Sequence, residues 1–259
     1  MIKNMVKRLV IKLFFIIILV LLNGCEKKSH YSNKHGAKMP RVIRAPNLME
    51  PVPAVEKVRQ LVMKFPNSGY AYYLLGCAYY GRREYSKAVS AFEKSLDLDP
   101  AIIGAYYGLA YSYNILGKWD HTKLIWEKLL QLPPPTKEDI YAAYMGLGNV
   151  ALDQHWKTKD VSFLSEAEKA YQRALKVTPQ KADAYYGLGI VFARRQQWDK
   201  AKELFEMAFS LSSTPRDKAK SLEALANIWL EKGDREHAKR LIEQARKIDP
   251  NYPATLFAQ

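Results

Sequence analysis

Tyr72–Pro100 reads YYLLGCAYYGRREYSKAVSAFEKSLDLDP, and the chain that follows repeats its pattern of apolar and small residues. For example, Leu109 stands where Leu75 stands in this stretch, one repeat further along the chain. A fixed period near 34 residues indicates a repeat protein, in which every copy is one small structural unit. The sequence therefore predicts an array of similar units that stack on one another.

Each unit is expected to contain two helices joined by a short turn. Tyr72, Leu75 and Tyr79 are spaced by three and four residues, so they share one face of a first helix. Phe92 belongs to the matching apolar stripe of a second helix, and Pro100 ends that helix because proline lacks the backbone N–H. Neither helix buries its stripe alone, so the units must pack together.

This pattern resembles the tetratricopeptide repeat (TPR). The resemblance implies an all-α fold, a right-handed superhelical solenoid of about five helix pairs with one N-terminal capping helix. The predicted segments are a signal peptide (1–24), a lipidated cysteine with a flexible tether (25–53), the capping helix (54–68), five units (69–102, 103–136, 141–181, 182–215 and 219–252) and a C-terminal tail (253–259). Spacers are expected at 137–140 and 216–218. In the third unit an insertion around His155–Phe163 is predicted to lengthen the turn between the helices.

The first residues are typical of a secretory signal peptide. A basic start with Lys3, Lys7 and Arg8 precedes the apolar run Leu13–Leu22. This run is shorter than the roughly 20 residues that a membrane-spanning helix needs, but it suits the core of a signal peptide.

Leu22-Asn23-Gly24-Cys25 follows this run and resembles the bacterial lipoprotein box. The resemblance implies acylation of Cys25 and cleavage just before it. An uncleaved signal anchor with a cytoplasmic solenoid is the alternative. The residue after Cys25 is Glu26 rather than aspartate, which by the sorting rule of enteric bacteria favours the outer membrane, facing the periplasm. The only other cysteine is Cys77, so acylation of Cys25 would exclude a disulfide within the chain.

The chain is strongly basic, with 40 Lys and Arg against 26 Asp and Glu and a net charge of +14. In an exported protein this charge favours anionic partners, such as lipid headgroups, lipopolysaccharide, acidic polymers or an acidic protein face, over nucleic acid. A basic exterior that is merely solvated is the alternative.

Motifs of catalysis and metal binding are not found in the sequence. The glycine pairs at 146–148 and 187–189 fall on helix-packing positions and have no strand before them. The five histidines are scattered, without metal-ligand spacing to one another or to a cysteine. We therefore expect no enzymatic activity, no cofactor and no metal. Loss of a turnover activity on substitution of one polar groove residue would instead favour an enzyme.

Recognition is the remaining function. In TPR arrays the first helices line a concave groove, and the resemblance places ten residues of this chain there: Tyr70, Tyr73, Cys77, Tyr80, Tyr107, Tyr111, Asn114, Met145, Asn149 and Tyr186. Tyrosine joins a large rigid ring to a hydroxyl group and suits peptide docking. The alternative is that several of these rings pack inward between units. The basic clamp of chaperone-binding TPR domains is missing from these positions.

The sequence thus predicts a lipid-anchored, non-catalytic adaptor that binds a protein or peptide and assists assembly of an envelope complex. It resembles the TPR lipoproteins that help assemble type IV pilus secretins or outer-membrane β-barrel proteins. An adaptor for peptidoglycan enzymes is the alternative within the same class.

Overall fold

The computed structural model describes residues 55–132 and 135–253, and every regular element within these ranges is an α-helix. The predicted signal peptide, Cys25 and the tether up to residue 53 lie outside the described residues. No helix within the described ranges is both long and apolar enough to cross a bilayer.

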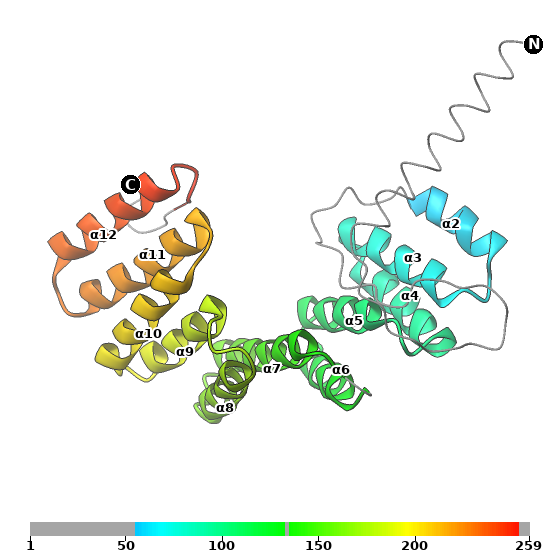
Figure 1. The fold of residues 1–259 in the computed structure, drawn as a ribbon, viewed down its shortest axis with the longest axis horizontal. Coiled ribbons are helices and arrows are strands. Elements are labelled where there is room, and N and C mark those ends of the chain that lie inside the picture. The colour runs from blue at the N-terminus through cyan, green and yellow to red at the C-terminus, as the bar shows by residue number, and fades with distance from the viewer. Residues whose placement is uncertain (1–54, 133–134, 254–259) are drawn as a thin grey trace, which may run out of the picture.

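The helices follow one another in antiparallel pairs that form an arch (Figure 1). The pairs are α3 (Gly69–Gly81) with α4 (Tyr85–Leu98), α5 (Ile103–Ile115) with α6 (Trp119–Gln131), α7 (Lys137–Thr158) with α8 (Ser162–Val177), α9 (Ala182–Arg194) with α10 (Trp198–Leu211), and α11 (Pro215–Glu231) with α12 (Arg235–Ile248). A single helix, α2 (Val55–Lys64), packs on α3 at the N-terminal end. This arrangement confirms the predicted all-α solenoid of helix pairs with one additional helix.

The inner side of the arch is formed by first helices. Figure 1 shows α5, α7 and α9 along the inner side, with α6 and α8 on the outer side. Consecutive first helices also contact one another directly, as α3 does with α5 and α7 with α9. A concave surface is therefore built from one helix of each pair.

Large rings of the second helices fill the core where glycines leave room. The ring of Phe92 on α4 is 1% exposed, and a Cβ atom added at Gly76 of the same pair would lie 2.5 Å from it. Tyr171 on α8 fills the same kind of space, 2.6 Å from a Cβ atom added at Gly148 and 2.6 Å from one added at Gly187 of the next pair. The small positions of the repeat are thus needed for close approach of the helices.

Two helices begin earlier than the repeat pattern predicts. Thr136 and Asp139 form a capping box, in which the Asp139 N–H donates to Thr136 Oγ1 at 3.1 Å, so α7 starts at Lys137. Thr214 caps α11 by accepting a hydrogen bond from the Asp217 N–H, and Pro215 occupies the first turn. Residues 137–140 and 216–218, which were expected to be spacers, therefore belong to helices.

The insertion of the third unit lies in a helix rather than in a turn, so that prediction was wrong. α7 has 22 residues, whereas α5 and α9 have 13 each. The helix continues to Thr158 and ends at Lys159, which has a left-handed φ of 61°. The turn to α8 is consequently as short as those of the other pairs.

Candidate functional site: the concave surface

The predicted groove residues lie on α3, α5, α7 and α9, the helices that contribute to the concave surface. Their exposure differs widely. Tyr111 is 39% exposed and Asn149 is also exposed, whereas most of the others are half-buried. The surface is thus a mixture of accessible rings and side chains that are shared with the core.

Tyr73 is the exception, because it is buried and does not face the groove as predicted. Its side chain is 1% exposed, and its ring stacks on Tyr70 at 5.9 Å and lies 6.1 Å from the ring of Phe92. A Cβ atom added at Gly104 of α5 would lie 2.8 Å from this ring. The glycine in the next unit leaves room for the tyrosine to turn inward.

Two tyrosines of α5 pack on one buried tryptophan. The rings of Tyr107 and Tyr111 meet the ring of Trp126 edge to face, with centroids 5.4 and 5.6 Å away. Trp126 is 1% exposed, and Gly146 of α7 leaves room for it. The tryptophan therefore holds both tyrosines in place; it lies on a second helix, which is why a search of first-helix positions missed it.

Polar side chains link α5 to α7 beside these rings. The Tyr107 hydroxyl donates to Asp139 Oδ1 at 3.1 Å, and the Asn114 amide donates to Asp153 Oδ2 at 2.9 Å. Oδ1 of Asn114 is buried and accepts no hydrogen bond from the described residues. Because this oxygen is buried, a ligand cannot reach it in this conformation, and the Asn114 amide serves to hold α5 against α7 through Asp153. Asp153 was not among the predicted residues, because acidic residues on helices are usually solvated.

The predicted residues of α7 and α9 contact side chains of neighbouring helices. Asn149 accepts a hydrogen bond from the Tyr171 hydroxyl at 2.7 Å. Tyr186 packs on Phe205 at 5.3 Å, and Lys220 of α11 places its ammonium group 4.2 Å from the centre of the Tyr186 ring. Met145 is half-buried and packs against the core around α8. The side chains accessible to a ligand here are therefore the Asn149 amide and the Lys220 ammonium group above the Tyr186 ring.

Cys77 is a half-buried thiol on α3. Burial raises the pKa of this thiol to about 11, and a hydrogen bond with Tyr73 opposes the shift in part. The thiol therefore stays protonated at neutral pH and is a poor nucleophile.

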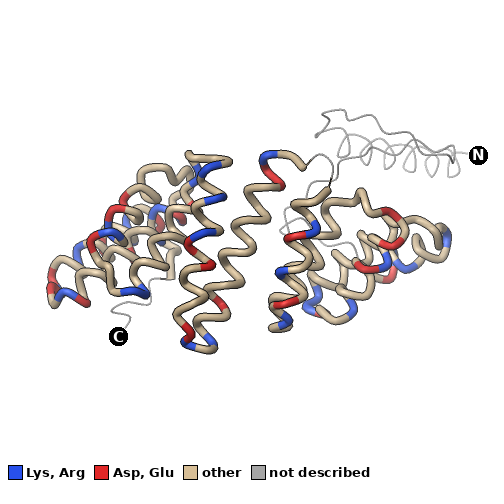
Figure 2. The backbone as a smooth tube through the Cα atoms, turned by 90° about the horizontal axis from the view of Figure 1, so that it is seen from below, with Lys and Arg blue, Asp and Glu red and all other residues tan. Residues whose placement is uncertain are grey.

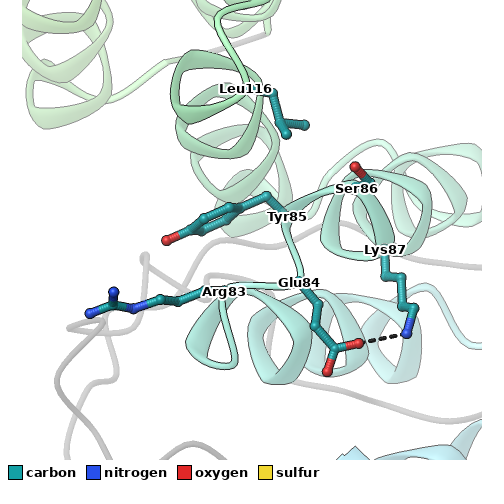
Figure 3. Close-up of a pocket in the computed structure, with 6 residues that line it drawn as sticks. All are labelled: Arg83, Glu84, Tyr85, Ser86, Lys87 and Leu116. Atoms are coloured by element: carbon teal, nitrogen blue, oxygen red, sulfur yellow. Dashed lines mark hydrogen bonds and ion pairs between the residues drawn. The ribbon is translucent and has the colours of Figure 1, made fainter.

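A shallow depression lies outside the concave surface, at the turn between α3 and α4 (Figure 3). It is lined by Arg83, Glu84, Tyr85, Ser86, Lys87 and Leu116. Lys87 Nζ lies 2.7 Å from Glu84 Oε2, so the charges of these two residues neutralise each other. Within the described ranges, no cluster of three or more His, Cys, Asp or Glu side chains is placed to hold a metal ion.

Family models match two segments of the described helices. The tetratricopeptide repeat model matches residues 69–102, and a second model described as TPR repeat matches residues 164–201. The chain contains TPR repeats. The first match covers α3 and α4, and the second runs from α8 into α10.

Solved TPR structures share the fold. A thermophilic TPR protein of Thermus thermophilus is 24% identical, with a TM-score of 0.58 over 71% of this chain and 93% of that protein. YrrB, described as a TPR protein with an unusual peptide-binding site, is 21% identical, with a TM-score of 0.50 over 76% of this chain and 95% of that protein. PilF of Pseudomonas aeruginosa is 14% identical, with a TM-score of 0.59 over 76% of this chain and 85% of that chain. At these identities the likeness is one of fold.

Curated relatives are much longer proteins. Cellulose synthase operon protein C of Xanthomonas axonopodis pv. citri is 30% identical over 114 residues, which are 40% of this chain and 7% of that protein. Superkiller protein 3 of Schizosaccharomyces pombe is 25% identical over 148 residues, which are 56% of this chain and 10% of that protein. The TPR chain thus spans only a small part of the length of these relatives.

Proposed function

We propose that this TPR protein is a non-catalytic scaffold that binds an extended segment of a partner protein along its concave surface. The observation that carries the proposal is the surface of α5, where two partly exposed apolar side chains lie one helical turn apart on the same face. Tyr111 is 39% exposed and Ile115 is 49% exposed. TPR proteins as a class bind proteins and peptides, so the class of ligand agrees with this surface.

The same surface favours particular ligand chemistry. An apolar or aromatic side chain of the ligand can lie on Tyr111 and Ile115. Asp153 on α7 and Asp183 on α9 are both exposed on neighbouring first helices. They attract a Lys or Arg side chain rather than a carboxylate. The ligand is therefore an apolar segment with a basic residue, although the chain as a whole is basic.

We further propose that the scaffold is attached to a bacterial envelope membrane through acylated Cys25 and assists assembly of an envelope complex. Support comes from the basic start, the short apolar run and the Leu-Asn-Gly-Cys sequence at residues 22–25. The outer membrane is favoured because Glu26 follows the cysteine.

Photocrosslinking tests the groove. A benzophenone amino acid placed at Tyr111 should give discrete crosslinks to a partner in envelope fractions, identified by mass spectrometry. The matched control is the same amino acid at Leu124, which is 48% exposed and belongs to α6, a helix on the outer side of the arch. Equal crosslinking at both positions would show that the concave surface is not the binding site.

The affinity for the partner identified in this way provides a second test of the groove. Tyr111→Ala should weaken binding by about thirtyfold or more, because an aromatic anchor at an interface is often worth about 2 kcal/mol or more. Leu124→Ala should leave the affinity unchanged. An unaltered dissociation constant for Tyr111→Ala would exclude the concave surface as the binding site.

A further inference from the structure

The extended end of α7 presents two large apolar side chains to solvent. Trp156 is 60% exposed and Val161, in the turn that follows, is 69% exposed. We call residues 156–161, together with Arg194 at the end of α9, the tryptophan turn. It exists because α7 is longer than α5 and α9, and the α7–α8 connection protrudes at one edge of the solenoid (Figure 2).

Hydrogen bonds fix the tryptophan turn in one conformation. His155 Nδ1 lies 2.8 Å from the carbonyl oxygen of Asp160, and the Asp160 N–H donates to Thr158 Oγ1 at 3.2 Å. The Ser162 N–H donates to Asp160 Oδ1 at 2.8 Å. Lys159 closes the helix with its left-handed φ of 61°. The exposed side chains thus stand on an ordered support, which reduces the entropy lost on binding.

Cations surround the tryptophan ring. Lys159 Nζ lies 4.3 Å from the ring centre, and the guanidinium carbon of Arg194 lies 4.8 Å from it. Lys157 is exposed beside them. Asp160 is the acidic residue of the turn, and one of its oxygens already accepts the hydrogen bond from Ser162. Three cations therefore face one carboxylate at this tip.

Nearby carboxylates do not neutralise these cations. Glu166 of α8 is paired with Lys123 at 2.8 Å, and Glu168 is paired with Arg195 at 2.5 Å. Among the described residues, Lys157, Lys159 and Arg194 form no ion pair. The tryptophan turn therefore presents uncompensated positive charge together with apolar surface.

We propose that the tryptophan turn docks on an anionic lipid bilayer. Tryptophan prefers the headgroup level of membranes, and neighbouring lysine and arginine side chains bind lipid phosphates. Trp156 and Val161 lie on a protrusion rather than in a groove, a shape that suits a deformable surface better than a rigid peptide. The inference goes beyond the proposed scaffold, because it adds a second membrane contact that would orient the solenoid.

Fluorescence of the full-length protein in vesicles tests the inference. The protein is reconstituted into phosphatidylcholine vesicles with or without phosphatidylglycerol, carrying brominated acyl chains as quenchers. The emission of Trp156 is obtained as the difference between the wild type and Trp156→Phe, and vesicle association is measured separately by co-sedimentation. We expect quenching of Trp156 in the anionic vesicles only, and less quenching as salt is added.

Charge reversal supplies the matched pair of variants. Lys157→Glu changes the charge of the tip without touching the cations on the Trp156 ring, and should weaken docking about fivefold per unit of charge. Lys94→Glu changes an exposed lysine of α4 by the same amount and should have no effect. Equal effects of both variants would overturn the assignment, because they would reflect net charge alone.

The outcomes separate this inference from the proposed anchor. Co-sedimentation with both vesicle types but no quenching of Trp156 would overturn docking and leave the acyl anchor standing. Co-sedimentation with anionic vesicles alone, with Trp156 quenched, would support docking and refute the anchor. Association with neither type would refute both. Quenching of Trp156 fluorescence by acrylamide tests an acidic protein as the partner instead. If polyglutamate protects Trp156 from this quenching better than anionic vesicles do, the tryptophan turn binds an acidic protein.

Discussion

The ring of Phe92 occupies the space that a side chain at Gly108 would need: a Cβ atom added there would lie 2.3 Å from the ring. Phe92 belongs to α4 and Gly108 to α5 of the next pair, so this contact joins two consecutive units.

Gly108→Ala should therefore destabilise the protein by about 1–3 kcal/mol, the usual cost of overpacking a core. Urea denaturation followed by circular dichroism measures the loss. The double variant with Phe92→Leu should show a smaller additional cost of Gly108→Ala, because the smaller side chain leaves room for the methyl group. Equal costs in both backgrounds would mean that the ring is not the obstacle.

Turn residues allow backbone strain to be measured apart from packing. Gly117 has a φ of 69° and nothing within 4 Å of an added Cβ atom, whereas Arg83 has a φ of 61° at the equivalent turn. Gly117→Ala should cost about 1 kcal/mol through strain alone, and Arg83→Gly should stabilise the protein by several tenths of that amount. Thermal unfolding checks both signs. A gain from Gly117→Ala would contradict the left-handed conformation of that turn.

Alkaline pH should weaken the fold through Tyr186. Burial, with a further contribution from Glu223, raises the pKa of Tyr186 from the ordinary 10.0 to about 12. Because the folded state holds this proton more tightly, the contribution to stability is complete below about pH 10 and is lost as the pH rises towards 12. Urea midpoints at about pH 9 and about pH 11.5 measure the loss. Tyr186→Phe cannot ionise and should lose less stability; an identical fall would exclude this residue as a cause.

Acylation at Cys25 can be tested on the whole chain. Cys25→Ser should accumulate as an uncleaved precursor and should no longer partition into detergent as a lipid-modified protein. Intact-mass measurement of the wild type should show loss of residues 1–24 and the added mass of acyl chains. Wild-type protein that retains Met1–Gly24 would favour the signal anchor instead.

Much of the architecture could be predicted from residue spacing alone. The period places Leu75, Phe92 and their counterparts on helix faces that must be buried, and the structure has them in the core. The extent of α7 could not be predicted, because inserted residues satisfy the same spacing whether they extend a helix or a turn. Only the hydrogen bonds and the cap at Lys159 decide between these two arrangements.

The groove could be predicted only in part, since Tyr73 and Tyr107 occupy equivalent positions in the repeat but differ in burial. The unit after Tyr73 offers Gly104 at the facing position, whereas the unit after Tyr107 has Ala142 at the corresponding place. The orientation of each ring thus depends on a residue about 30 positions away, which a reading of single units does not include.

The rings shared between neighbouring pairs have a consequence for how the array opens. Tyr171 is enclosed by glycines of two successive pairs, so separating those pairs exposes a whole aromatic side chain in one step. The ring shared by the last two described pairs is that of Phe205 on α10, which belongs to one buried cluster with Leu222 and Leu225 of α11. Detaching α11 and α12 therefore disturbs one shared ring, whereas unfolding a middle pair disturbs the shared rings on both of its sides. The helix pairs of the solenoid should therefore unfold one after another from an end of the array.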